Sequence, residues 1–191
     1  MDVIEAIHSW RTIRSFRSDA LERAEVEDLI WHAVQVSTPP GNVTPWSLCV
    51  LEGVEEIKQL GEQAIDFARE NRPPGEAGWS WVDRPGFKVF WDAPVVVLIS
   101  ALAGNSAAGF DCHRAGQNLV LAAHASGFGS CWLGAPLPWL QSAGVAAALG
   151  VPSGFEPAVV VALGRSAERP EPKSRSRPEI IWYSDHVPQL S

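Results

Sequence analysis

The sequence has few of the features that mark secreted, membrane-spanning or metal-clustered proteins. Only three cysteines occur among its 191 residues. They are widely spaced and form no CxxC pair, which argues against a disulfide framework or a cysteine-rich metal site. The longest apolar runs, 93–99 and 158–163, are far shorter than the roughly 20 residues that cross a bilayer. Segment 1–11 also lacks the apolar core of a signal peptide, so we expect a cytoplasmic protein.

Positive charge is scarce and unevenly distributed. Lys and Arg total 15 against 22 Asp and Glu, which gives a formal net charge of -7. Such a balance disfavours nucleic-acid binding, because that needs a broad basic face to neutralise phosphates. Yet most of the basic residues lie in two short segments near the ends of the chain: Arg11, Arg14, Arg17, Arg23, Arg165, Arg169, Lys173, Arg175 and Arg177.

These two segments predict a binding site for an anion. Arg11-Thr12-Ile13-Arg14 and Lys173-Ser174-Arg175 each place two cations around a hydroxyl residue. Guanidinium groups match phosphate oxygens, and hydroxyls add further donors. The sequence contains neither a GxxxxGK[ST] loop nor a GxGxxG loop after its first strand, which argues against the common nucleotide sites. We therefore expect one phosphate pocket, closed from both ends of the chain.

Hydrophobic periodicity predicts one α/β or α+β domain with a single central sheet. Asp111 is expected to cap a helix that carries Ala115 and Leu119 inward. The continuous apolar run at 95–100 is typical of a strand that is buried on both faces. The other expected helices are 2–10, 22–36, 54–70 and 137–149, and the other expected strands are 47–51, 130–133 and 158–163.

Nine tryptophans stand against one tyrosine and one methionine. Three of them, Trp79, Trp81 and Trp91, lie in segment 71–91, which is also rich in proline and glycine. Irregular segments of this length are uncommon in compact domains and are often functional. Two interpretations stay open: a variable lid that stacks these rings on a flat substrate, or a surface loop whose aromatic side chains pack on the core.

Several blocks of the sequence resemble the nitroreductase family of flavin oxidoreductases. WRTIRSF at 10–16 resembles the family segment RRSIRxF, and STPPGNVTPW at 37–46 resembles APSGxNxQPW. DAPVV at 92–96 resembles DAPVVI, and GFGSCWLG at 127–134 resembles GLGSCWIG. The block DCHRAGQNLVLAA, which begins at Asp111, resembles the family helix DxGxAxQNLxLAA. Lys173-Ser174-Arg175 resembles the basic pair that the family has beyond its last strand. The blocks occur in the family's order along nearly the whole chain.

The resemblance implies a nitroreductase-like α+β fold over residues 1–191, with a central mixed sheet flanked by helices. It further implies an intertwined homodimer in which the tail of segment 165–191 embraces the other subunit. The cofactor would be FMN at the subunit interface. By family analogy, its phosphate would contact Arg11, Thr12, Arg14, Lys173 and Arg175.

The same resemblance implies which residues meet the flavin ring. Pro39, Pro40 and Asn42 would line the ring from the partner subunit. The block containing Cys131 would bring the backbone near Leu133 and Gly134 to the reactive nitrogen of the flavin. No side-chain acid or base is then required, because the cofactor carries the hydride chemistry. The implied activity is NAD(P)H-driven, ping-pong reduction of nitroaromatic or quinone-like acceptors.

Three departures from the family pattern keep other functions open. Trp10 stands where the family has Arg, Pro39 replaces Ser, and Thr44 replaces Gln. They fit a specialised flavin-dependent oxidase or dehydrogenase of an organic substrate, a member using a deazaflavin partner, or a non-catalytic flavin-binding offshoot. A cysteine nucleophile at Cys112 with His113 as base is disfavoured, because adjacent helical residues point about 100° apart.

Overall fold

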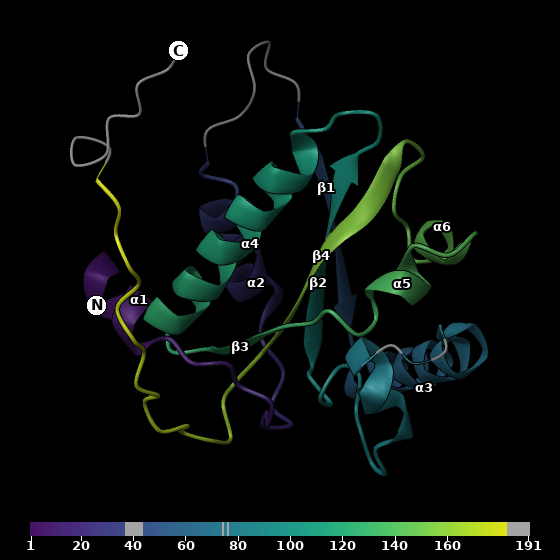
Figure 1. Cartoon of the computed structure of the whole chain (residues 1–191), viewed down its shortest axis with the longest axis horizontal. Helices are drawn as coiled ribbons and strands as arrows, with labels where there is room; N and C mark the ends of the chain where they lie inside the picture. The colour runs from purple at the N-terminus through teal and green to yellow at the C-terminus, as the bar shows by residue number, and fades with distance from the viewer. Residues whose placement is uncertain (37–43, 74, 76, 183–191) are drawn as a thin grey trace.

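The computed structural model describes residues 1–36, 44–73, 75 and 77–182. Its centre is a four-stranded sheet in the order β1 (Trp46–Glu52), β2 (Val95–Leu102), β4 (Phe155–Gly164) and β3 (Gly129–Trp132) (Figure 1). All three pairs of neighbouring strands are antiparallel. The expectation of a mixed sheet is therefore wrong for these four strands, which form an antiparallel sheet. A parallel contact occurs as an isolated bridge between Thr12 and Ser130 of β3.

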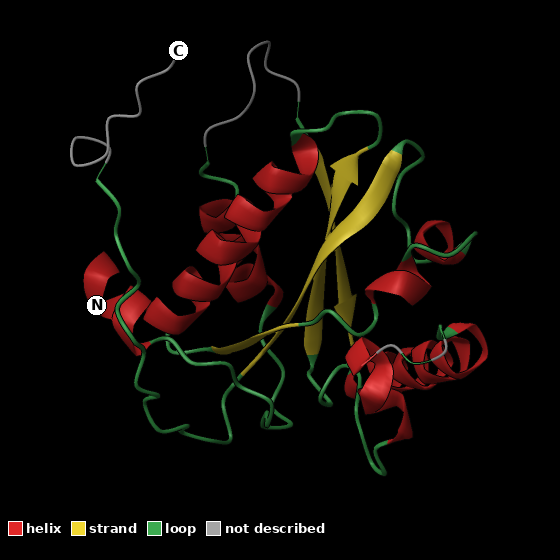
Figure 2. Cartoon of the chain, in the orientation of Figure 1, coloured by secondary structure: helices red, strands yellow, loops and turns green. Residues whose placement is uncertain are grey.

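Helices cover both faces of the sheet, as the red ribbons in Figure 2 show. The two longest helices, α3 and α4, lie on opposite faces. The helices are α1 (Val3–Ser9), α2 (Arg23–Ala33), α3 (Val54–Asn71), α4 (Ala108–Ala125), α5 (Leu137–Leu140) and α6 (Val145–Ala148), with a 3₁₀ helix η1 at Ala77–Asp83. Within the described ranges, no helix is both long and apolar enough to cross a membrane.

The strand β2 divides the hydrophobic core into two halves. Val97 and Ile99 belong to the cluster that α2 and α4 cover, whereas Val96 and Leu98 belong to the cluster that α3 and α5 cover. Because successive side chains of a strand point to opposite faces, a strand with a helix layer on each side is apolar throughout. The prediction of a doubly buried strand is therefore confirmed.

Two predictions about helices are wrong. Asp111 does not cap α4, because the helix begins three residues earlier at Ala108, and the side chain of Asn105 accepts the N–H of Ala107 instead (3.0 Å). The expected helix over 137–149 is two short helices, because Gly144 adopts a left-handed conformation (φ 84°) that an α-helix cannot contain. The remaining helix and strand predictions are confirmed, with ends that shift by a few residues.

Segment 71–91 is more regular than expected. It contains η1, and the rings of Trp81, Phe87 and Trp91 pack against the core cluster beneath α3. Residues 165–182, beyond β4, form no helix or strand, and in Figure 1 this yellow segment passes close to α1.

Candidate anion-binding site

The N-terminal segment that follows α1 is hydrogen-bonded to β3 and to the segment that follows β4. The N–H of Ile13 donates to the carbonyl of Ser130 in β3 (2.9 Å). Farther along, the N–H of Arg17 donates to the carbonyl of Arg165 (2.8 Å), and the N–H of Ala167 donates to the carbonyl of Ser15 (2.9 Å). The backbone carrying the first basic motif is thus bonded to both β3 and the chain that leaves β4.

The carboxylate of Glu168 tightens this junction. It accepts the backbone N–H of Arg14 and that of Ser15, the latter at 3.0 Å. Ser166 fixes the backbone of Glu168 in turn, because its hydroxyl donates to the Glu168 carbonyl (2.6 Å). Glu168 therefore ties the C-terminal basic segment to the N-terminal one.

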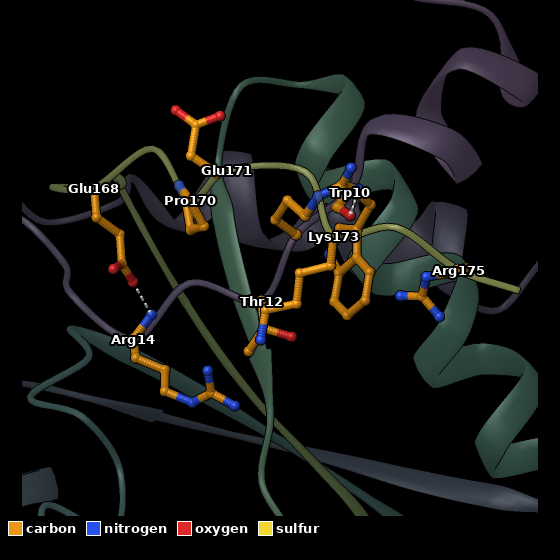
Figure 3. A pocket seen from close by; sticks show the side chains of 9 residues that line it. Trp10, Thr12, Arg14, Glu168, Pro170, Glu171, Lys173 and Arg175 are labelled. Atoms are coloured by element: carbon orange, nitrogen blue, oxygen red, sulfur yellow. Dashed lines mark hydrogen bonds between the residues drawn. The ribbon is translucent and has the colours of Figure 1, made fainter.

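Between the two segments lies a pocket of about 360 Å³. Figure 3 shows the side chains around it, with Lys173 beside Trp10 and Thr12 at the centre of the view, Arg175 at the right and Arg14 at the lower left. The carboxylate of Glu171 points away from this group in the same view. The lining residues are Trp10, Arg11, Thr12, Arg14, Glu168, Pro170, Glu171, Lys173 and Arg175.

The four cations of this pocket differ from most other basic residues of the chain. Arg11, Arg14, Lys173 and Arg175 form no ion pair with any described residue. Eight other cations do pair with carboxylates: Arg17, Arg23, Lys58, Arg69, Arg72, Lys88, Arg114 and Arg165. The pocket is lined by these four cations and by two carboxylates, Glu168 and Glu171, so its excess of positive charge favours an anion in a chain of net charge -7.

The side chain of Arg11 is only partly satisfied. Its Nη1 donates to the carbonyls of His8 (2.8 Å) and Trp10 (2.7 Å). Its Nε is buried and has no hydrogen-bond partner in the described part of the chain. Buried donors are seldom left without an acceptor, so this atom favours a ligand oxygen at the pocket. Trp10, the departure from the family motif, donates from Nε1 to the Ser130 hydroxyl (3.0 Å) and helps wall the pocket.

The segment after β3 offers one free backbone donor outside this pocket. The N–H of Leu133 is already used, because it donates to the carbonyl of Val160 (2.9 Å). The N–H of Gly134 donates to none of the residues that the structure describes, and the space beside its Cα is open. Of the two expected backbone positions, Gly134 is therefore the one that can meet a ligand.

Two other residues of this glycine-rich block have structural roles. Gly129 leaves room for the side chain of Ile13, since a Cβ there would lie 2.9 Å from Cγ2 of Ile13. The space beside Gly129 is therefore occupied by protein. Cys131 is only 1% exposed, so its thiol belongs to the core and is shielded from a surface ligand.

The buried thiols are poor nucleophiles at neutral pH. Burial raises the pKa of Cys131 to about 11, and burial together with the nearby Asp111 carboxylate raises that of Cys112 to about 11. Both are therefore protonated in the folded protein. We expect iodoacetamide at pH 8 to leave both unmodified in the native protein and to alkylate both in urea, as mass spectrometry would measure. Rapid alkylation of Cys112 in the native protein would show that this thiol is reactive and would support a nucleophilic role for it.

The three expected substrate tryptophans form one aromatic cluster outside the pocket. The rings of Trp79 and Trp81 stack with centroids 6.2 Å apart, and Phe87 contacts both Trp81 (5.2 Å) and Trp91 (5.3 Å). The guanidinium carbon of Arg14 lies 5.7 Å from the ring centre of Trp91, so this cluster adjoins the pocket at Arg14. Trp79 and Trp81 do not line the pocket.

The expected residues are thus only partly brought together. Arg11, Thr12, Arg14, Lys173 and Arg175 share one pocket, whereas Cys131, Leu133 and Gly134 lie outside its lining. Pro39, Pro40 and Asn42 lie outside the described residues. Glu168 was not expected from the sequence, although an acid inside a basic segment was a usable signal for a partner of that segment.

Comparison with known proteins identifies the family of this chain. The family model described as the nitroreductase family matches residues 7–165. The chain belongs to the nitroreductase family. The resemblance drawn from the sequence blocks is therefore confirmed.

Individual nitroreductase-like proteins extend this comparison. A relative from Methanothermobacter thermautotrophicus, named "Putative NADH dehydrogenase/NAD(P)H nitroreductase", is 26% identical over 185 residues, which cover 95% of this chain and 86% of the relative. A nitroreductase from Bacteroides fragilis, solved with bound FMN, superposes with a TM-score of 0.81 at 21% identity, covering 95% of this chain and all of that one. Iodotyrosine deiodinase, solved with FMN and 3-iodo-L-tyrosine, superposes with a TM-score of 0.72 at 19% identity, covering 95% and 98%. At these identities the solved structures establish the nitroreductase fold.

Proposed function

We propose that this nitroreductase-family chain is an FMN-dependent oxidoreductase. The observation that carries the proposal is the convergence of four cations without carboxylate partners on one pocket between the chain's two basic segments. A phosphate monoester carries up to two negative charges and three acceptor oxygens, which matches such a set of donors. The relatives solved with FMN support the choice of a flavin phosphate over other anions.

The residues present fit this cofactor. Arg11, Arg14, Lys173 and Arg175 would hold the phosphate, and the buried Nε of Arg11 would gain the acceptor that it lacks. The free N–H of Gly134 would donate to the flavin ring. A backbone donor at a developing negative charge stabilises it without reorganisation.

The proposed reaction is reduction of nitroaromatic or quinone-like acceptors by NADH or NADPH. The chemistry that FMN supplies when bound is hydride transfer from the nicotinamide and onward to the acceptor in a second half-reaction. The protein contributes binding, orientation and charge: the cations anchor the phosphate, and Trp10 walls the pocket. The half-buried rings of Trp79, Trp81 and Trp91 provide flat surfaces at the edge of the site for an aromatic substrate.

A flavin titration tests the proposal. The purified protein is mixed with FMN, and the visible spectrum and flavin fluorescence are followed before and after anaerobic addition of NADH or NADPH. We expect saturable binding and bleaching of the flavin bands by at least one nicotinamide. A protein that ignores FMN contradicts the proposal, and a bound flavin that neither nicotinamide reduces contradicts its NAD(P)H-driven part.

We also propose that the enzyme works as a homodimer. Large apolar side chains are exposed on α1 (Val3, Ile4 and Ile7), and Trp31 on α2 is 66% exposed. The tail adds Ile180, Ile181 and Trp182, of which Ile181 is 74% exposed. Apolar surface of this extent is unusual on a monomer and is typical of subunit interfaces.

Removal of residues 178–191 should therefore convert the dimer to a monomer and lower flavin retention. Light scattering coupled to size-exclusion chromatography measures the mass, and the ratio of flavin to protein absorbance measures retention. Glu179→Ala in the full chain is the matched control, because it changes the same tail without removing apolar surface. A truncated chain that stays a flavin-loaded dimer would contradict the role of the tail.

A further inference from the structure

Arg14 is the one pocket cation that touches the aromatic cluster. Glu168 fixes its backbone N–H, but its guanidinium forms no ion pair or hydrogen bond with the described residues. Instead the guanidinium carbon lies 5.7 Å from the ring centre of Trp91, within the range of a cation–π interaction. The Trp91 ring is thus the contact that restrains where the charged end of Arg14 lies.

The ring of Trp91 is itself held in place by an unusual backbone. Trp91 and Asp92 have φ angles of 57° and 50°, a left-handed region that non-glycine residues seldom adopt. The N–H of Ala93 donates to the carbonyl of Phe90 (3.1 Å) across this turn, and Lys88 pairs with the Asp92 carboxylate. Phe87 meets the Trp91 ring edge-on at 69°. Such conformations persist only where the surroundings enforce them, and they cluster at functional sites.

We propose that Trp91 is a positioning residue that orients the Arg14 guanidinium toward the anion pocket before a phosphate binds. The proposal rests on the proposed function, since it takes the anion to be the FMN phosphate. Long cationic side chains lose rotamer freedom when they bind an anion, and a side chain already restrained loses less. Trp91 would therefore strengthen binding of the phosphate without touching it.

This role has a measurable signature in the comparison of FMN with riboflavin, which lacks the phosphate. The dissociation constant for riboflavin divided by that for FMN isolates the phosphate's contribution to binding, and this quotient is the ratio used below. Trp91→Leu removes the π face, so we expect this ratio to fall about 3- to 10-fold, in the range of a partly exposed cation–π contact. Trp91→Phe keeps a weaker π face and should give an intermediate ratio. Riboflavin affinity itself should change little.

A structural role for Trp91 would give a different result. If the substitution only loosened segment 71–91, FMN and riboflavin would weaken equally and the ratio would stay constant, which would overturn the proposal. Trp81→Leu is the matched control, because it removes a ring from the same cluster that does not contact Arg14. The proposal is also overturned if Trp81→Leu lowers the ratio as much as Trp91→Leu does.

A double-mutant cycle completes the test. In an Arg14→Met background, Trp91→Leu should no longer change the ratio, because the cation that it orients is gone. Additive losses would contradict the coupling. The affinities of the wild-type protein for FMN and riboflavin separate the proposed FMN dependence from the proposed role of Trp91. A wild-type protein that binds neither flavin overturns both proposals. A wild-type protein that prefers FMN while Trp91→Leu keeps the full preference overturns the role of Trp91 alone.

Discussion

Replacing Arg175 with alanine is expected to weaken FMN binding by about 1–3 kcal/mol, the range for a hydrogen bond to a charged group. Arg14→Ala should have an effect of the same size. Both guanidinium groups line the pocket without a carboxylate partner among the described residues, so their charge is available to the phosphate. Quenching of flavin fluorescence on titration measures the change.

Each of these substitutions has a neighbouring control. Arg177 lies two residues from Arg175 in the same exposed segment but does not line the pocket, so Arg177→Ala should leave FMN affinity nearly unchanged. Arg17 serves for Arg14, because it pairs with Asp19 outside the pocket. Full FMN affinity in both Arg175→Ala and Arg14→Ala would show that the phosphate binds elsewhere.

Gly129→Ala is expected to destabilise the fold by about 1–3 kcal/mol, as overpacking of a filled space does. The added Cβ would lie 2.9 Å from Cγ2 and 3.1 Å from Cβ of Ile13, and a β-branched side chain has little freedom to move aside. Because the N–H of Ile13 bonds to Ser130, displacement of Ile13 also shifts the segment that carries Arg11 and Arg14. Chemical denaturation measures the stability, and FMN titration measures the effect on the site.

Two further variants separate this clash from a general glycine effect. Gly109→Ala places a methyl group in α4 where nothing lies within 4 Å, so it should be neutral or stabilising. Ile13→Ala combined with Gly129→Ala restores the space and should recover part of the loss that Gly129→Ala causes alone. If the double variant is no more stable than the sum of the two single changes predicts, the packing explanation is wrong.

The parts of the fold that were predictable from the sequence depend on periodicity and local chemistry. The apolar run at 95–100 forms a doubly buried strand because helices cover both faces of the sheet. The two basic motifs likewise predicted one pocket, because both segments carry cations and hydroxyl groups that match the oxygens of a phosphate. The strand could be predicted from the hydrophobicity of consecutive residues, and the pocket from the positions of the basic residues.

The parts that were missed depend on contacts between distant residues. Whether the N–H of Leu133 or of Gly134 is free is decided by which of them Val160 engages across the sheet. The space at Gly129 is filled by Ile13, more than a hundred positions earlier in the chain. No local pattern distinguishes Glu168 from the other acidic residues of the sequence, and only the fold brings its carboxylate to the backbone N–H of Arg14.

The pocket draws one wall from residues 10–14 and the other from residues 168–175. Contacts between segments so far apart in sequence form late in folding, after the loop between them has closed. During synthesis the first wall leaves the ribosome long before the second exists. The strand β4, which joins β3 to β2, is made just before the second wall, so the sheet and the phosphate site are both completed near the end of synthesis. Cofactor loading would then be a post-translational step, and growth without riboflavin should yield a folded apoprotein that accepts FMN when it is added later.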